Sequence, residues 1–536
     1  MKKLYLWAVA ALALTLTLAG ILPAPARGAE QAIKFAMHNL AGTVDPGITA
    51  ETYAIPIINN MFEGLVTYDA GNNIIPGNAE SWETSDDGLV FTFHLRKGLK
   101  WSDGSPLTAE DFRYSYIRVA KPETASLHSD LVLPYVAGAQ EFFEGKIGED
   151  GVGIEAVDDL TLKITLKAPA PFFLALLASH TFYPVQKATV EANGDKWTLS
   201  PETFVSNGPF KVTAINFKES YEFVKNENYW NAENVKLERL TFVYITDTST
   251  ALTAFRAGEI DGFWEAPASD LPALRAESDE LVTVRAFGTT YHLLNNLVPP
   301  FDNPLVRKAF NLAIDRRALI EDVLGTNDIP AYALVSPGYV VNGKDVTEGR
   351  STYGLAPGAQ PEAARAALAE AGYPDGKGFP PIEYYYSTND TYKKTVEALT
   401  AMLKTNLNIE ITLKTADWAV YFADVKAGKF QIGNMGWGGG YLHPMTFLPL
   451  LVTDAVDNNS RYSNPEYDAL VAEIQSTADP VKGAELIRKA EDVSMKDYPL
   501  LPLFHRSYPY MMRRGTAGYF RNPLNNLFFR DAYVTE

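Results

Sequence analysis

Histidines are the first residues to test for catalytic or metal-binding chemistry, because the chain has no cysteine. No two of them stand at the spacing of three or four residues that places two imidazoles on one helix face around a metal ion. The serine-acylation sequences Gly-x-Ser-x-Gly and Ser-x-x-Lys are also missing. We therefore expect no catalytic residue, no metal and no cofactor. The seven histidines are His38, His94, His128, His180, His292, His443 and His505.

Two glycine-rich segments come close to nucleotide-binding motifs. Residues 338–344 have the Gly-x-x-x-x-Gly-Lys spacing of a phosphate-binding loop, but Asp345 stands where Ser or Thr would hold magnesium. Because its carboxylate would repel phosphate, we interpret this segment as a surface loop. Residues 436–440 resemble the start of a dinucleotide loop, but Tyr441 breaks the pattern. Neither segment predicts a nucleotide cofactor.

Carboxylates are abundant, so spacing alone leaves open a pair of acids of the glycosidase type. Asp87-Gly88 and Asp103-Gly104 are more typical of tight turns, in which Asp and Gly serve the backbone. We expect the turn interpretation to hold at most such positions.

The elements that carry these residues alternate between short strands and capped helices, which is typical of an α/β fold. Residues 90–95 and 162–166 alternate apolar and polar side chains with a period of two, which predicts half-buried strands. Asn303 is a good helix cap and Gly325 a good helix end, which bounds one helix. The predicted helices are residues 303–325, 361–372 and 392–403.

The first residues have the three-part layout of a secretory signal. Two lysines precede an apolar run, residues 4–18, and small residues follow soon after it. This run is too short for a typical membrane span. We therefore predict a signal peptide over residues 1–28, cleaved after Ala26 or Gly28. The alternative is a retained membrane anchor.

Composition narrows the compartment and the partners. Without cysteine, an exported chain has neither disulfides nor a lipid-modified cysteine, so hydrophobic burial must hold it together. A hydrophobic content of 46% against 21% charged residues predicts a globular chain, and 536 residues predict two or three domains. The net charge of −18 disfavours nucleic acid and anionic lipid as partners. The mature chain is expected to be free in solution, with no membrane anchor.

A series of short blocks in a fixed order carries a family resemblance. The blocks are Asp45-Pro46, Phe62-Glu63-Gly64, Glu80-Ser81-Trp82, Lys100-Trp101-Ser102-Asp103-Gly104, Ser206-Asn207-Gly208-Pro209-Phe210, Asn228-Tyr229-Trp230, Ala257-Gly258-Glu259-Ile260-Asp261 and Ala313-Ile314-Asp315-Arg316. With them the chain resembles the oligopeptide- and dipeptide-binding components of ABC importers along essentially its whole mature length. The blocks are specific for the family and much less for the ligand, because they mostly build the scaffold.

The resemblance implies an α/β architecture of the type II periplasmic-binding-protein kind, in which two lobes close on a cleft. Hinge strands are expected near Thr290 and His505. Three domains are implied: domain I from residues 29–62, 185–288 and 506–536, an inserted domain II from residues 63–184, and domain III from residues 289–505.

The resemblance also implies ligand-binding positions, at which this chain departs from the family pattern. A Gly-Trp pair of the family matches Gly436 and Trp437. Gly440 stands where the oligopeptide-binding members have an aspartate that holds the α-amino group of the peptide. Asn434 stands where an arginine of the family can meet peptide carboxylates. The expected charged partners of a peptide are therefore missing at these positions.

Two further positions complete the predicted site. Trp418 matches a cleft tryptophan of the family, and Thr52 aligns with a residue whose backbone touches the ligand. A core position is the alternative to pocket lining for Trp437, and for Trp418 the two interpretations are evenly balanced. Tyr441 and Phe447 are expected in the core.

The resemblance implies a monomeric periplasmic binding protein that captures peptides, above all oligopeptides, and hands them to the permease subunits of an ABC importer. An extended peptide in such a cleft would gain affinity from main-chain hydrogen bonds to both lobes. Another solute, such as an oligosaccharide, a modified peptide or an opine-like compound, is the alternative that Gly440 keeps open. A secreted hydrolase is a third possibility and would need a catalytic set that the sequence does not show.

Overall fold

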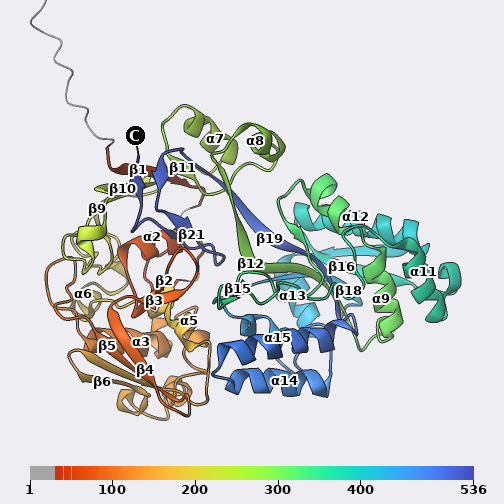
Figure 1. Ribbon diagram of the computed structural model, residues 1–536, viewed down its shortest axis with the longest axis horizontal. Coiled ribbons are helices and arrows are strands. Elements are labelled where there is room, and N and C mark those ends of the chain that lie inside the picture. Colours follow the sequence, from red (N-terminus) through yellow and green to blue (C-terminus); the bar gives the residue numbers. More distant parts are fainter. Residues whose placement is uncertain (1–29, 40, 50, 536) are drawn as a thin grey trace, which may run out of the picture.

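The computed structural model describes residues 30–39, 41–49 and 51–535 of the chain. Two lobes lie side by side in Figure 1, and two long strands, β12 (Leu281–Leu294) and β19 (Leu500–Met512), run between them. The predicted signal peptide, residues 1–28, lies outside the described residues.

One large sheet extends through both lobes. Its strands follow the order β17, β16, β18, β12, β19, β11, β1, β10, β9 and β8, and β13 pairs with β19 off this path. The first lobe, at the left of Figure 1, holds β1 and β8 to β11, and the second lobe holds β16 to β18. Besides β12 and β19, the strands are β1 Ala32–Met37, β8 Phe210–Asn216, β9 Ser220–Lys225, β10 Arg239–Tyr244, β11 Gly262–Phe263, β13 Ile329–Pro330, β16 Ile382–Ser387, β17 Ile411–Ala416 and β18 Ile432–Gly438.

Strands β12 and β19 form the ladder that joins the lobes. They pair antiparallel from Leu281 opposite Met511 to Leu293 opposite Leu500, with a shift of register between Arg285 and Thr289. Such a bulge bends a strand and increases its local twist. The strands predicted as hinges near Thr290 and His505 are thus partners of each other in one ladder.

A second, smaller sheet lies in the first lobe. It has the order β4 (Ala79–Thr84), β5 (Val90–Leu95), β7 (Thr161–Thr165) and β6 (Ile154–Asp158). Strand β5 has the bounds predicted from its period of two, and β7 begins one residue before the predicted strand. Their apolar residues face inward, since burial alternates along both strands.

The prediction of one continuous helix over residues 303–325 is wrong, because the helix is interrupted at Ile314 and Asp315. Helix α9 (Pro304–Ala313) ends where Ile314 becomes extended, and Asp315 then caps a new turn by accepting the Ala318 N–H at 2.8 Å. Helix α10 (Arg316–Ala318) and the π-helical turn η7 (Leu319–Leu324) follow. The break arises because Asp315 offers a second N-cap inside the apolar pattern.

The structure also contains further α-helices, several 3-10 turns and short strand pairs. Helix α12 (Asp390–Leu407) exceeds the predicted residues 392–403 because Asn389 caps its first turn. The loop predicted at residues 338–344 forms the exposed hairpin of β14 and β15. The remaining α-helices are α2 Ile55–Met61, α3 Ala109–Ala120, α4 Ala139–Phe143, α5 Phe173–Leu177, α6 Lys187–Asn193, α7 Thr248–Arg256, α8 Leu271–Glu277, α11 Pro361–Glu370, α13 Trp418–Lys426, α14 Pro465–Ser476 and α15 Pro480–Met495. The short pairs are β2 Val66–Tyr68 with β3 Ile74–Pro76, β14 Val340–Val341 with β15 Lys344–Asp345, β20 Thr516–Ala517 with β23 Tyr533–Val534, and β21 Phe520–Arg521 with β22 Leu527–Phe528.

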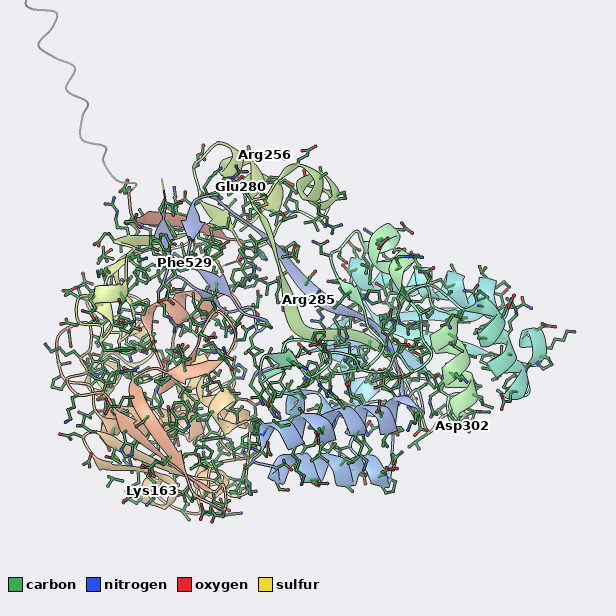
Figure 2. The ribbon with its side chains drawn as sticks, in the orientation of Figure 1. Lys163, Arg256, Glu280, Arg285, Asp302 and Phe529 are labelled. Atoms are coloured by element: carbon green, nitrogen blue, oxygen red, sulfur yellow. The ribbon has the colours of Figure 1, made fainter. Side chains whose placement is uncertain are left out.

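The end of the chain returns to the lobe that holds its beginning. Phe529, labelled in Figure 2, packs edge-on against Phe35 of β1, with 5.8 Å between the ring centres. The Asn60 side chain of α2 donates to the Leu527 carbonyl and accepts the Phe529 N–H. Asn60 and Phe529 are 469 residues apart in the sequence, and their segments therefore share one core.

A buried ion pair fixes the opening segment to the rest of the first lobe. The Asp45 carboxylate accepts two hydrogen bonds from the Arg118 guanidinium, at 2.9 and 2.7 Å, and a third from Trp197 Nε1 at 2.8 Å. Arg118 lies on α3, so this contact joins three separate segments of the lobe. Paired, hydrogen-bonded geometry of this kind makes a buried charge tolerable.

Replacing Asp45 with Ala is expected to lower the free energy of unfolding by about 3–5 kcal/mol, because Arg118 would remain buried without its partner. Urea denaturation measures the change. Asp86→Ala, at an exposed turn position, is the control and should stay within about 0.5 kcal/mol of the unmodified protein. Equal stability of the two variants would contradict this account of Asp45.

Candidate functional site

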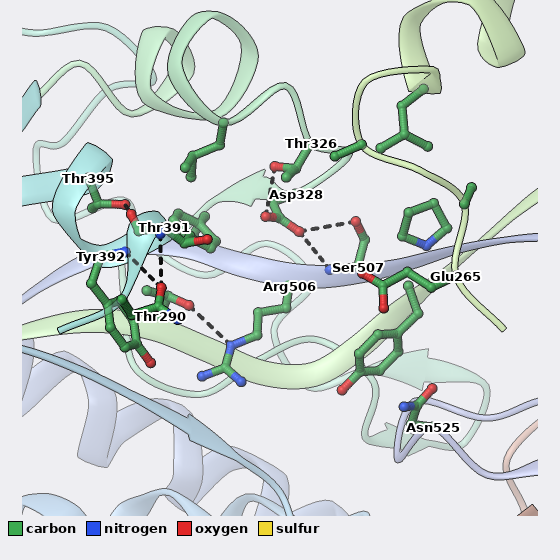
Figure 3. A pocket seen from close by; sticks show the side chains of 18 of the residues that line it. Glu265, Thr290, Thr326, Asp328, Thr391, Tyr392, Thr395, Arg506, Ser507 and Asn525 are labelled. Atoms are coloured by element: carbon green, nitrogen blue, oxygen red, sulfur yellow. Dashed lines mark hydrogen bonds between the residues drawn. The ribbon is translucent and has the colours of Figure 1, made fainter. Parts of the chain in front are cut away.

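A cavity of about 700 Å³ lies where the two lobes meet at β12 and β19. We call it the interlobe cavity. The first lobe contributes Thr52, Tyr53 and the segment after β11, and the second lobe contributes the start of α12. Figure 3 shows how side chains from separate segments converge around the two strands. A volume in this range suits a small ligand.

The two crossing strands form the floor of the interlobe cavity. Thr290 and His292 of β12 and Phe504 and Arg506 of β19 line it. Residues two apart on a strand point to the same face, which explains why these pairs share the cavity. The Thr290 hydroxyl oxygen accepts a hydrogen bond from Arg506 Nε at 3.1 Å, as Figure 3 shows.

Glycines make room for the Arg506 side chain on this floor. A Cβ at Gly436 of β18 would overlap Arg506 Nη2, and a Cβ at Gly288 of β12 would lie 3.9 Å from Arg506 Cδ. Arg506 therefore extends from β19 across β12 toward β18, with its stem beside Gly288 and its guanidinium over Gly436. Only a glycine at position 436 leaves space for this arrangement.

Two acidic residues line the interlobe cavity, and both have partners within the protein. Asp328 accepts the Ser507 N–H at 2.7 Å and the hydroxyls of Ser507 and Thr326 at 3.1 and 2.8 Å. Burial raises the pKa of Asp328, which these hydrogen bonds partly oppose. Glu265 lies 3.6 Å from Nε2 of His38. Burial lowers the pKa of that His38 imidazole.

Arg521 lines the cavity as a buried cation. Its guanidinium lies 3.8 Å from the centre of the Trp264 ring and donates to the Trp264 carbonyl at 2.9 Å. It also donates to the Asn525 side-chain oxygen at 2.6 Å. Burial lowers the pKa of Arg521 to about 10, which still leaves it charged at neutral pH.

His292 is a neutral polar group on the cavity floor. Its Nδ1 is hydrogen-bonded with the Tyr384 hydroxyl, and burial lowers its pKa to about 3. Among the described residues its Nε2 has no hydrogen-bond partner. The ring thus offers one nitrogen whose hydrogen-bonding capacity is unused.

The structure brings some of the predicted site residues to the interlobe cavity. Thr52 lines it directly. Gly436 lies beneath the Arg506 guanidinium, and the neighbouring Met435 is part of the lining. These positions come from segments that are far apart in the sequence and meet at the junction of the lobes.

Trp437 and Gly440 lie on the continuation of the same strand and do not line the cavity. Trp437 is partly buried, and its Nε1 and the Gly440 N–H both donate to the Thr446 hydroxyl at 3.3 Å. Gly440 is exposed, and a Cβ at this position would meet no atom within 4 Å. The loop then turns to the first lobe, where Tyr441 stacks on Phe172 with 5.2 Å between ring centres.

Trp418 and Asn434 lie away from the cavity. Trp418 begins α13, is 50% exposed and stacks on Phe422. Asn434 is fully buried, and its side-chain oxygen accepts the Ser387 N–H at 2.9 Å. In this arrangement Asn434 fixes the end of β16 and makes no contact with the cavity. Tyr441 and Phe447 are buried, as predicted.

Sequence reasoning missed the charged residues of the cavity, above all Arg506. One signal was available, since a single arginine stands within the largely apolar strand β19. A cation in such a strand needs either a partner or a polar cavity. Asp328, Glu265 and Arg521 stand in loops and a short strand and carried no comparable signal.

The described residues show no metal site and no membrane-spanning helix. No group of three or more His, Cys, Asp or Glu side chains is arranged to hold an ion within the described part of the chain. Across the same residues, every helix is too short or too polar to cross a bilayer.

Sequence comparison defines the family. The profile of the bacterial extracellular solute-binding proteins, family 5 Middle, matches residues 73–459, which is more than half of the chain. The oligopeptide-binding protein OppA of Bacillus subtilis is 33% identical over 500 residues, covering 92% of this chain and 90% of its own. The probable deoxycholate-binding periplasmic protein YgiS of Escherichia coli is 32% identical over 511 residues, covering 94% of each. The chain therefore belongs to family 5 of the bacterial extracellular solute-binding proteins.

Solved structures agree with this assignment. The unliganded open form of the murein tripeptide-binding protein MppA superposes with a TM-score of 0.85 at 31% identity, covering 95% of this chain and 98% of that one. The Haemophilus influenzae OppA complex with the peptide RPPGFSPFR gives 0.70 at 31% identity, covering 95% and 99%. The predicted two-lobe α/β architecture and the predicted family are confirmed, and members of this family are binding proteins.

Replacing Asn434 with Ala is expected to lower the free energy of unfolding by about 1–3 kcal/mol, because the buried Ser387 N–H would lose its acceptor. Chemical denaturation measures this loss. A variant of unchanged stability with weakened ligand binding would instead place Asn434 in the ligand site.

Proposed function

We propose that this protein captures peptides in the interlobe cavity and delivers them to the permease of an ABC importer. The observation that carries the proposal is that both lobes contribute walls to one cavity above the strands that join them. A ligand held there is contacted from both sides, so binding favours a closed arrangement of the lobes. Family membership and the names of relatives such as OppA support peptides as the ligand class.

The described conformation corresponds to the open, ligand-free state. The backbone superposes better on the unliganded open form of MppA than on the peptide complex of OppA, with TM-scores of 0.85 and 0.70 at equal identity. We infer that closure turns the lobes about the β12–β19 ladder. Trp418, Trp437 and Gly440, which lie outside the cavity here, would approach the ligand on closure.

The proposal includes export and release from the membrane. Residues 1–28 serve as a signal peptide that is removed after Ala26 or Gly28, and the mature protein is a monomer, free in the periplasm. The N-terminal residue of exported protein tests this step. Domain I would consist of residues 29–62, 185–288 and 506–536, domain II of residues 63–184, and domain III of residues 289–505.

A non-peptide solute is the second candidate ligand. Two observations favour it: Gly440 places no carboxylate where the family holds a peptide amine, and one full-length relative is named as a probable deoxycholate-binding protein. The peptide proposal and this alternative use the same cavity and differ only in the ligand that fills it.

A pool of tetrapeptides with free termini is expected to raise the melting temperature, because a ligand at about a hundred times its Kd adds roughly 2.7 kcal/mol to the free energy of unfolding. Scanning calorimetry of the mature chain measures the shift, with an oligosaccharide pool and deoxycholate as parallel samples. If peptides leave the melting temperature unchanged and one of the two alternatives raises it clearly, that solute is the ligand and the peptide proposal is wrong.

Gly440→Asp is expected to strengthen binding of free-amine peptides relative to their N-acetylated forms. The new carboxylate has open space in the described structure, and pairing a buried amine is worth about 3–5 kcal/mol where the partner is otherwise missing. Calorimetry with one matched peptide pair on both proteins measures the preference. A strong preference of the unmodified protein for the free amine would show that another acid already holds it.

A further inference from the structure

We propose that Arg506 is the specificity-determining residue of the interlobe cavity and receives a carboxylate of the ligand. This inference rests on the proposed function, since it assumes that the ligand is held in that cavity. It goes beyond that function by specifying that the ligand group facing the cavity floor is negatively charged.

The guanidinium of Arg506 is oriented before any ligand arrives. Its Nε is engaged by the Thr290 hydroxyl at 3.1 Å, and its stem runs beside Gly288. Its Nη2 lies over the bare backbone of Gly436, and the two terminal nitrogens point away from Thr290 in Figure 3. A planar fork held in this way suits the two oxygens of a carboxylate.

No acid of the described residues satisfies Arg506. None of their carboxylates lies within 4.0 Å of it, whereas the nearby acids are engaged elsewhere. Asp328 is held by Ser507 and Thr326, and Glu265 lies beside His38. Closing the lobes over a partly buried cation that has no counter-ion costs free energy, because the cation loses water. A ligand that supplies the missing negative charge removes this cost.

The β18 side of Arg506 also carries no acid that would compete with a ligand for it. The sequence from position 431 to 453, which includes β18 and the following loop, has no aspartate or glutamate. The other cations of the cavity differ from Arg506 in setting. Arg521 is stacked on Trp264 and bonded to Asn525, and Lys394 is exposed to solvent on α12.

Three tetrapeptide pools of otherwise equal composition test the proposal. The first has no carboxylate, being built from neutral residues with a C-terminal amide. The second has a free C-terminal carboxylate, and the third has one internal glutamate and a C-terminal amide. All keep a free amine, so that only the carboxylate differs. Isothermal calorimetry on the mature protein gives the affinity for each pool.

The unmodified protein is expected to bind at least one carboxylate-bearing pool roughly 10- to 100-fold more tightly than the neutral pool, which is typical of a charged hydrogen bond. Arg506→Gln should abolish that preference, and Arg506→Lys should retain part of it. Arg285→Gln is the matched control, because Arg285 is an exposed arginine of the paired strand that does not line the cavity (Figure 2). It should keep the full preference.

The possible failures are distinguishable. Absence of binding for all three pools to the unmodified protein would overturn the peptide function itself. Binding of the neutral pool as tightly as the acidic pools would overturn the inference alone and would indicate that Asp328 or Glu265 pairs with Arg506 on closure. A carboxylate preference that survives in Arg506→Gln would also overturn it. Melting temperatures without ligand show that each variant is folded.

Discussion

The antiparallel ladder of β12 and β19 is the constraint on which the rest of the structure depends. It makes a single sheet continuous through both lobes, so that neither lobe can be placed independently of the other. A ladder of backbone hydrogen bonds resists sliding but permits twisting and bending, most easily at a bulge. The register shift between Arg285 and Thr289 lies beside the residues that floor the interlobe cavity. The site therefore lies beside the irregular part of the connection, where bending is easiest.

Placing the site on the ladder gives it rigid elements on one side and movable walls on the other. Thr290 is fixed by its pairing with Phe504 and holds Arg506 through a hydrogen bond, whereas Thr52 and Tyr392 belong to opposite lobes. A ligand that touches all of them gains contacts only when the lobes approach. Its binding free energy is thereby coupled to closure, since a ligand shifts an equilibrium by its differential affinity for the two states.

Local patterns in the sequence predicted local structure well and the site poorly. Strand β5 follows from its period of two, and the fold follows from ordered blocks such as Asp45-Pro46, whose carboxylate proves to be a buried structural partner. The cavity is different because Thr290 and Arg506 are 216 residues apart and become neighbours only through strand pairing. Asn434 shows that a sequence match alone does not place a side chain in the cavity. Its position matched a family ligand site, but its amide oxygen accepts the Ser387 N–H in the core.

Gly436 of β18 and Gly440 in the loop that follows it affect the charge around the ligand site in different ways. Gly440 stands where the family has an aspartate and so removes a negative charge, whereas Gly436 leaves space for the guanidinium of Arg506, which extends from β19. Gly436 thus allows a cation on the cavity floor, and Gly440 adds no acid to the loop that would approach the ligand on closure, although the chain as a whole carries a net charge of −18. Within a closing, poorly hydrated cavity the local charge governs ligand choice, because interactions with more distant surface charges are screened by water and salt.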